Sequence, residues 1–177
     1  MALLNYLPEL NTEVLRLRRM QAADVTALSD IRSNHKVNKY ISRPDRMSAE
    51  EALAFIHLKN EGIENGQWYY WAICFMNDPQ MIGAICLWNF SEDSLTAELG
   101  YELHPDHHGK GIMSDAVSLV IDFSRQINCL ILEAFTHYAN KASIQLLLKH
   151  GFVQDPERSD ASHKHNRIYI KDLKCGF

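Results

Sequence analysis

Two glycines, Gly109 and Gly111, lie in the part of the chain whose residues point most clearly to a chemical function. Before them, Tyr101 and Leu103 alternate with Glu102, which is typical of a partly buried strand. Pro105 ends that strand because it has no N–H to donate, and apolar residues recur at helical spacing from Ile112 onward. Glycine permits positive φ and close approach of a ligand to the backbone. A strand, a glycine turn and a helix N-terminus with free N–H groups together predict a phosphate-binding site.

The turn differs from two common phosphate-binding loops. A Walker A loop has Gly five residues before Gly-Lys and Ser or Thr directly after it, and His104 and Gly111 stand at those positions. The dinucleotide fingerprint Gly-x-Gly-x-x-Gly fails at its third glycine, where the chain has Ser114. Two glycines alone also fit a purely structural turn, so a second feature is needed to choose a ligand.

That second feature is the segment 140–152. Asn140 is a good N-cap, and Gly151 stands where a helix C-cap is expected. Between them an apolar stripe predicts an amphipathic helix, formed by Ile144, Leu147 and Leu148. An apolar run at 130–136 precedes this helix and predicts a buried strand.

Together the two segments resemble the GNAT superfamily of N-acetyltransferases. The turn is similar to the superfamily's acetyl-CoA pyrophosphate loop, Gln/Arg-x-x-Gly-x-Gly/Ala, and the second segment to its Asn-x-x-Ser…Gly-Phe helix. The resemblance is strongest to the branch of bacterial ribosomal-protein N-terminal acetyltransferases. It rests on Glu-Leu-Gly-Tyr at 98–101, Gly-Lys-Gly-Ile-Met-Ser at 109–114 and the pair Asn140 and Ser143, and its strong part covers about residues 96–152.

The resemblance implies acetyl-CoA as cosubstrate and an amine as acceptor. It implies that a backbone N–H near residues 99–101 binds the acetyl carbonyl, and that Gly100 permits this approach; relief of packing is the alternative. Asn140 caps its helix and is expected to bind the cofactor as well. The family's usual Gln or Arg falls on or near Asp106, which places a negative charge close to the pyrophosphate. The expected acetyl-CoA ligands are Leu99, Gly100, Tyr101, His108, Gly109, Lys110, Gly111, Ile112, Met113, Asn140 and Ser143.

Acetyl transfer from a thioester requires a deprotonated amine, a donor for the oxyanion and a proton for the thiolate. The resemblance implies that Ser143 donates the proton to the CoA sulfur, because leucines occupy 146–148 where many members carry tyrosine. A local hydrogen bond within the helix is the alternative. Glu98 is the candidate that orients or deprotonates the amine, with pairing to a basic residue as the alternative. Related enzymes also use a glutamate shortly after Gly-Phe, where Asp155 and Glu157 lie.

The acceptor class follows from the cost of deprotonation. An α-amine with a pKa near 7.8 is roughly 15% neutral at pH 7, whereas a lysine amine is only about 0.04% neutral. The difference is about 3.5 kcal/mol, so a site without a dedicated base favours an α-amine. We therefore expect a protein N-terminus, ribosomal proteins included, as acceptor. A small amine such as a polyamine, an antibiotic or an amino acid is the alternative, and a non-catalytic CoA-binding sensor is a different class.

Composition and short sequence patterns limit the class of ligand and the cellular compartment that we expect. The chain has 177 residues, a net charge of −4 and a pI near 6.1, which argue against direct nucleic-acid binding. No apolar run approaches the roughly 20 residues that span a membrane, and no signal peptide is evident. His104, His107 and His108 are interrupted by Pro105 and predict no metal site. Reduced thiols in a cytoplasmic protein are expected for Cys74, Cys86, Cys129 and Cys175. The sequence leaves the oligomeric state open.

The remaining pattern predicts one mixed α/β domain over residues 1–177. By the resemblance, it has a central, mostly antiparallel sheet with a splayed parallel pair, flanked by helices. Ser48 and Glu51 form a capping box, and Gly62 and Gly66 are expected to end that helix. Residues 68–71 either pack in the core or line the acceptor site. Helices are expected at 22–33 and 48–61, strands at 13–19, 68–75, 81–88 and 167–173, and a turn at 77–79.

Overall fold

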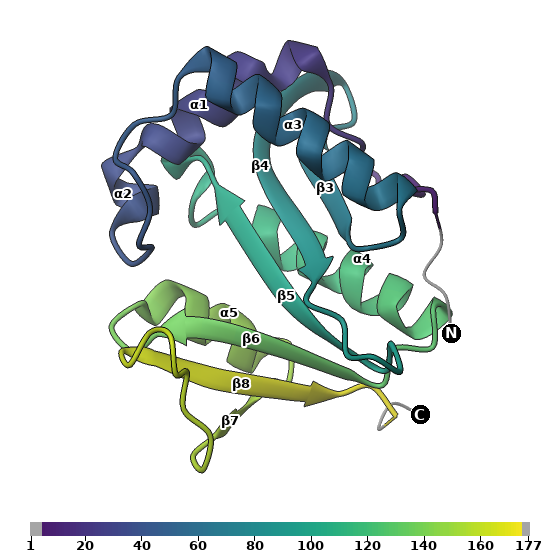
Figure 1. Ribbon diagram of the computed structural model, residues 1–177, viewed down its shortest axis with the longest axis vertical. Coiled ribbons are helices and arrows are strands. Elements are labelled where there is room, and N and C mark those ends of the chain that lie inside the picture. Colours follow the sequence, from purple (N-terminus) through teal and green to yellow (C-terminus); the bar gives the residue numbers. More distant parts are fainter. Residues whose placement is uncertain (1–4, 175–177) are drawn as a thin grey trace.

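The computed structural model describes residues 5–174, and within them eight strands form a single sheet (Figure 1). Their order across the sheet is β1-β2-β3-β4-β5-β6-β8-β7. Among these neighbours, β5 and β6 alone run parallel. The strands are β1 Leu10–Asn11, β2 Leu15–Arg18, β3 Tyr69–Phe75, β4 Asp78–Trp88, β5 Thr96–Leu103, β6 Ile131–His137, β7 Val153–Asp155 and β8 Asn166–Asp172.

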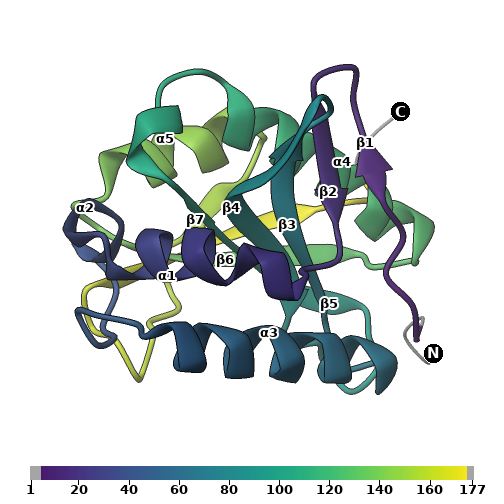
Figure 2. The same cartoon turned by 90° about the horizontal axis from the view of Figure 1, so that it is seen from above.

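Helices cover both faces of this sheet (Figure 2). One face carries the 3-10 turn η1 Ala22–Asp24 and the helices α1 Val25–Ser33, α2 His35–Asn38 and α3 Ala49–Glu64. The other carries α4 Ile112–Gln126 and α5 Lys141–Lys149, and a second 3-10 turn, η2 Pro105–His107, joins β5 to α4. None of the described helices is long and apolar enough to cross a membrane. The predicted architecture, a mixed α/β fold with a mostly antiparallel sheet, is confirmed.

The parallel pair is splayed, as the sequence predicted. Its register runs over three pairs only, from Thr96 opposite Ile131 to Glu98 opposite Glu133. Beyond Glu98 the two strands diverge (Figure 1), whereas β8 stays paired with β6 along the whole of β6. From residue 99 onward, one edge of β5 therefore lies in the middle of the sheet without a neighbouring strand.

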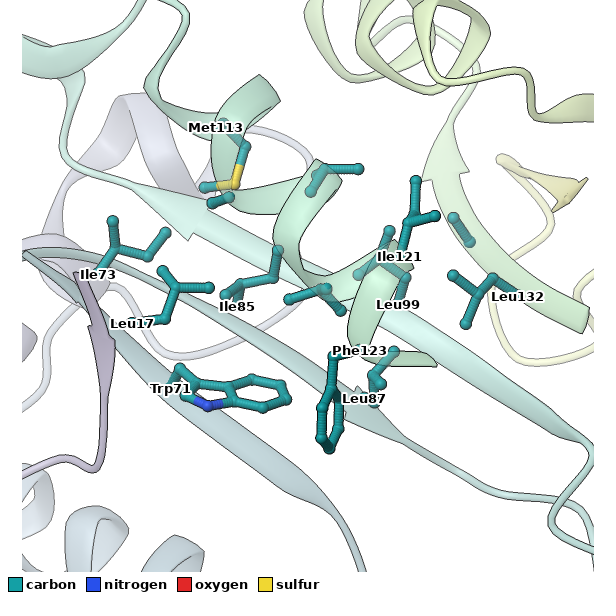
Figure 3. Packing of buried hydrophobic residues seen from close by; sticks show 14 of the residues in the cluster. Leu17, Trp71, Ile73, Ile85, Leu87, Leu99, Met113, Ile121, Phe123 and Leu132 are labelled. Carbon is teal, nitrogen blue, oxygen red and sulfur yellow. The ribbon is translucent and has the colours of Figure 1, made fainter. Parts of the chain in front are cut away.

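Side-chain alternation gives each face of the sheet its own apolar core. The core beneath α4 is shown in Figure 3, where Trp71 from β3 and Phe123 from α4 lie together with ring centroids 5.3 Å apart. The Trp71 indole N–H donates to the Pro8 carbonyl at 2.8 Å, which satisfies the polar atom of a fully buried ring. The opposite core, beneath α1 and α3, is smaller and includes Ile56, Tyr70 and Cys86.

Several element boundaries differ from the sequence prediction. The strand expected at 13–19 is β2, and the short β1 that precedes and pairs with it was not predicted. The expected turn at 77–79 is a two-residue turn at 76–77, because Phe75 pairs with Asp78 and β4 begins there. In α5, Leu147 is fully buried but Leu148 is 47% exposed, since the helix turns it away from the core.

The end of α3 also corrects the sequence prediction. Its start is confirmed, with Ser48 accepting from the Glu51 amide in the expected capping box. The helix, however, continues through the buried Gly62 to Glu64. A Cβ on Gly62 would lie 2.0 Å from Cζ2 of Trp68, so this glycine makes room for an indole. Gly66, with φ of +62°, is the glycine that follows the helix end.

Gly62→Ala should destabilise the protein. Helix propensity alone would favour Ala by up to about 1 kcal/mol. The methyl group would clash with Trp68, and overpacking of this kind costs about 1–3 kcal/mol. Urea denaturation should therefore give a lower free energy of unfolding for the variant. A variant more stable than the wild type would show that the indole moves aside freely.

Candidate active site

The side chains of β5 point alternately to the two faces of the sheet. Leu99 and Tyr101 pack with the core beneath α4. Glu98, Gly100 and Glu102 lie on the opposite side, where a Cβ on Gly100 would be 3.0 Å from Sγ of Cys86. We call the surface that carries these three residues the Glu98 face. We call the stretch beyond Glu98, where β5 and β6 diverge without pairing, the opening (Figure 1).

The turn that leads into α4 has the predicted backbone conformation. Gly109 and Gly111 have φ of +73° and +81°, and a Cβ at either position would meet nothing within 4 Å. The positive φ, and not crowding, therefore selects glycine here. Gly111 is the N-cap and offers no side chain to the first-turn N–H groups, which leaves those donors open to an anion. Such a turn can receive an anionic group such as a phosphate.

The residues just before this turn are tied to β5 and do not form a metal site. The His108 ring nitrogen Nε2 lies 2.9 Å from the Leu103 carbonyl oxygen, and His104 Nδ1 accepts from the Asp106 amide at 3.3 Å. Asp106, which stands near the family's basic position, has a side chain 84% exposed. Within residues 5–174, no group of three or more His, Cys, Asp or Glu is placed to hold a metal ion.

Tyr101 and Ser143 meet across the opening. The Tyr101 hydroxyl and Ser143 Oγ are 2.8 Å apart, while the Ser143 amide donates to Oδ1 of Asn140, which caps α5 as predicted. The Ser143 hydroxyl thus bonds to Tyr101 on β5, whereas its amide bonds to the cap of its own helix. Burial raises the pKa of Tyr101 to about 12, with the hydrogen bond to Ser143 acting in the other direction, so the phenol is protonated at neutral pH. The sequence named both residues but did not predict their contact.

Glu98 lies at the point where the parallel pairing ends. Burial raises the pKa of its carboxyl group from 4.5 to about 7, and the negative charges of Asp160 and Glu133 act in the same direction. Hydrogen bonds from Asn89, at 3.4 Å, and from Trp88 partly offset this rise. No cation pairs with Glu98 among the described residues, so its alternative role as an ion-pair partner is not what the structure shows. A carboxyl group with a pKa near neutrality can exchange protons with an amine at physiological pH.

The structure adds Glu133, which the sequence reading missed. Glu133 stands directly opposite Glu98 in the parallel register, and Arg158 binds its two oxygens at 2.5 and 3.1 Å. The sequence predicts an apolar strand here. The signal that could have identified Glu133 was a single carboxylate at an alternate position within that run. Its pairing with Arg158 joins β6 to the loop between β7 and β8, and so depends on a contact distant in sequence.

Of the two carboxylates expected after Gly-Phe, Asp155 makes local hydrogen bonds. Asp155 accepts from the amides of Glu157 and Arg158 and so shapes the turn after β7. The same loop brings Asp160 towards Glu98, and Asp160 in turn lies 3.6 Å from the His163 ring. His165 is exposed, but its ring packs with those of His137 and Tyr138.

The aromatic run at 68–71 divides between the two faces. Tyr69 and Trp71 belong to the core beneath α4, in agreement with the packing interpretation. Tyr70 is buried on the opposite side, and Trp68 packs against that core while its indole N–H donates to the Lys59 carbonyl.

Comparison with known proteins gives the family. Residues 15–153 match the family described as acetyltransferase (GNAT) domain. An uncharacterized N-acetyltransferase p20 of Bacillus licheniformis is 30% identical over 156 residues, which are 85% of this chain and 88% of the relative. The uncharacterized N-acetyltransferase YoaA of Bacillus subtilis is 28% identical over 149 residues, 84% of each chain. The chain belongs to the GNAT acetyltransferase family. It is thus an acyltransferase that uses acetyl-CoA as cosubstrate.

Solved structures agree on the fold. The ribosomal L7/L12 alpha-N-protein acetyltransferase RimL, solved with coenzyme A, superposes with a TM-score of 0.82 at 18% identity, covering 96% of this chain and 100% of that one. A ribosomal-protein-S5-alanine acetyltransferase from Vibrio fischeri gives a TM-score of 0.80 at 20% identity, covering 95% and 98%. At these identities the likeness supports the fold alone.

The raised pKa of Glu98 predicts a pH-dependent stability difference. Below pH 4.5 the carboxyl group is protonated in both folded and unfolded chains; above about pH 7 its buried charge costs stability. Glu98→Gln removes this cost, so the free energy of unfolding of the variant relative to wild type should rise between about pH 5 and pH 8. Urea titrations at both pH values measure it, with the exposed Glu92→Gln as control. A difference that stays constant would contradict the raised pKa.

Proposed function

We propose that this enzyme acetylates the α-amine of a protein N-terminus in the cytoplasm, by direct attack of the neutral amine on acetyl-CoA. The observation that carries the proposal is Glu98: a carboxyl group with a pKa near 7, on the face of β5 opposite the Tyr101–Ser143 pair. The fold shared with ribosomal-protein acetyltransferases supports the choice of acceptor, and the unpaired thiols of Cys74, Cys86 and Cys129 support the cellular setting.

In this proposal the chain binds acetyl-CoA chiefly through its backbone. The N–H groups of residues 108–113 hold the pyrophosphate at the start of α4, where the macrodipole favours negative charge. The free edge of β5 at 99–101 offers an N–H to the acetyl carbonyl, and that donor stabilises the oxyanion as the amine attacks. Asn140 and Ser143 approach from the start of α5.

Glu98 then orients the amine or receives its proton. An α-amine with a pKa near 7.8 and a carboxyl group with a pKa near 7 differ little, so the proton passes between them at small cost. A lysine amine would require about 3.5 kcal/mol more. The match of these two values favours an α-amine over a lysine side chain.

On the other side of β5, the Ser143 hydroxyl is the proton donor to the departing thiolate. The Tyr101 hydroxyl, 2.8 Å away and protonated at neutral pH, orients Ser143 and can return its proton. Both groups lie where β5 and α5 approach each other, at the opening that the splayed strands create.

Ser143→Ala should lower kcat about tenfold or more, while the KM for acetyl-CoA changes less than about threefold, because a proton donor acts mainly as the thiolate leaves. Tyr101→Phe keeps the ring and should give a smaller fall in the same parameter. Steady-state kinetics measure both, with Ser118→Ala on the exposed side of α4 as control. Near-normal turnover of both variants would leave the pair as a structural contact between β5 and α5.

Glu98→Gln should lower kcat/KM and should also change its pH dependence. In the wild type both Glu98 and the amine must be deprotonated, so activity falls along two titrations below about pH 7. The variant retains only the amine titration. The ratio of wild-type to variant activity should be at least about tenfold at pH 8 and shrink at lower pH. Parallel profiles would show that Glu98 takes no proton.

Thiol release with matched peptides tests the acceptor class. A peptide with a free N-terminus should release CoA thiol, and the same peptide with a blocked N-terminus and an internal lysine should not. Faster release with polyamines, antibiotics or amino acids would show that small amines are the acceptors. Tight CoA binding without release for any amine would identify a sensor instead.

A further inference from the structure

Three cations gather on the Glu98 face, beside the free part of β5. Arg32 from α1 and Arg43 from the loop before α3 both bind Glu102, at 3.3 and 2.7 Å. Lys59 from α3 is the third. We call Arg32, Arg43 and Lys59 the cation cluster. These ion pairs were not predictable from local patterns, and Glu102 itself is buried.

Lys59 is held by aromatic rings. Its ammonium lies 4.4 Å from the ring centroid of Trp68, 5.1 Å from that of Phe55 and 5.5 Å from that of Tyr70. No carboxylate pairs with it among the described residues. Burial lowers the pKa of Lys59, and the charge of Arg32 lowers it further. Lys59 also interacts electrostatically with Cys86, whose Sγ adjoins Gly100.

The cluster carries more positive charge than the protein itself neutralises. Arg32 and Arg43 share one carboxylate, Glu102, and Lys59 has none among the described residues. Nε of Arg32 and Nη2 of Arg43 are buried without a hydrogen-bond partner. Partly buried cations are costly unless they are paired, and unmet donors add to that cost. The side chains of Arg32 and Arg43 remain 18% and 12% exposed, so a further anion can approach the cluster.

The position of the cluster suggests where that anion would come from. Glu102 follows Gly100 by two residues on the same face, a separation of about 7 Å along a strand. Glu98 precedes Gly100 by the same interval. An amine at Gly100 would therefore have the proposed base on one side and the cation cluster on the other. The net charge of −4 repels anions at long range, but salt screens it beyond about 8 Å, whereas the cluster acts at contact.

We propose that the cation cluster is a subsite for a carboxylate that the acceptor carries within a few ångströms of its reactive amine. Building on the proposed function, this carboxylate is an acidic side chain in the first residues of the acceptor protein. The subsite would select among N-termini, and no bond is made or broken there. A small amino acid offers the same chemistry, and the experiment separates the two sources.

Matched peptides test the subsite. Two peptides differ only by Glu or Gln at the second residue, and a small pair comprises an amino acid and its amide. The wild type should prefer the Glu peptide about tenfold in kcat/KM, mainly through KM. Arg43→Gln and Lys59→Met should each reduce that preference below about threefold, and Arg43→Lys, which keeps the charge, should retain part of it. Lys36→Gln, exposed on α2, should leave both activity and preference unchanged.

The outcomes separate the subsite from the proposed function. Turnover of both peptides without preference, or with a preference that survives both variants, overturns the subsite and leaves N-terminal acetylation intact. A preference confined to the small pair keeps the subsite but refutes the protein acceptor. If no acceptor is turned over, the proposed function fails, and calorimetry with the CoA-bound enzyme decides the subsite. Tighter binding of the Glu peptide then supports it, and equal affinities overturn it.

Discussion

The end of the hydrogen-bonded pairing between β5 and β6, at Glu98 and Glu133, is the constraint on which the rest of this structure depends. A sheet that stayed paired would bury the backbone of 99–101 in a ladder and leave no edge for a thioester. The opening is held by contacts other than pairing between β5 and β6. β8 supports β6 along its length, Tyr101 bonds Ser143 on the α4 side, and the Tyr40 ring stacks on that of His137 at 5.1 Å. The splay is therefore a supported feature, and not simply a loose end of the sheet.

Electrostatics around this opening differ on its two sides. On the Glu98 face, burial and neighbouring carboxylates keep Glu98 easily protonated, while Arg158 neutralises Glu133. Further along β5, the two arginines of the cation cluster share a single carboxylate, that of Glu102. In the proposed binding mode, backbone N–H groups at the start of α4 hold phosphate without relying on side-chain charge. This use of backbone explains why Asp106, exposed near the family's basic position, is compatible with the loop.

Local patterns predicted most of the fold and half of the candidate site. Gly109, Gly111 and Asn140 were predictable because turn geometry and capping depend on neighbours in the chain. The sequence pattern wrongly predicts Gly62 as a helix stop, because the reason for this glycine is the Trp68 indole, which lies six residues further along the chain and packs against it only in the folded structure. Glu133 with Arg158, and Glu102 with Arg32 and Arg43, were missed for the same physical reason: long-range ion pairs leave no periodic signal. The Tyr101–Ser143 bond likewise joins residues that only the topology brings together.

Amide hydrogen exchange tests most directly whether acetyl-CoA binds at the free edge of β5 and at the turn before α4. Exchange is measured residue by residue with and without a non-hydrolysable acetyl-CoA analogue. New protection is expected at 99–101 and 108–113, with little change at 96–98, which already pair with β6. Protection confined to other parts of the sheet, or none at 99–101 despite saturating ligand, would contradict this binding mode.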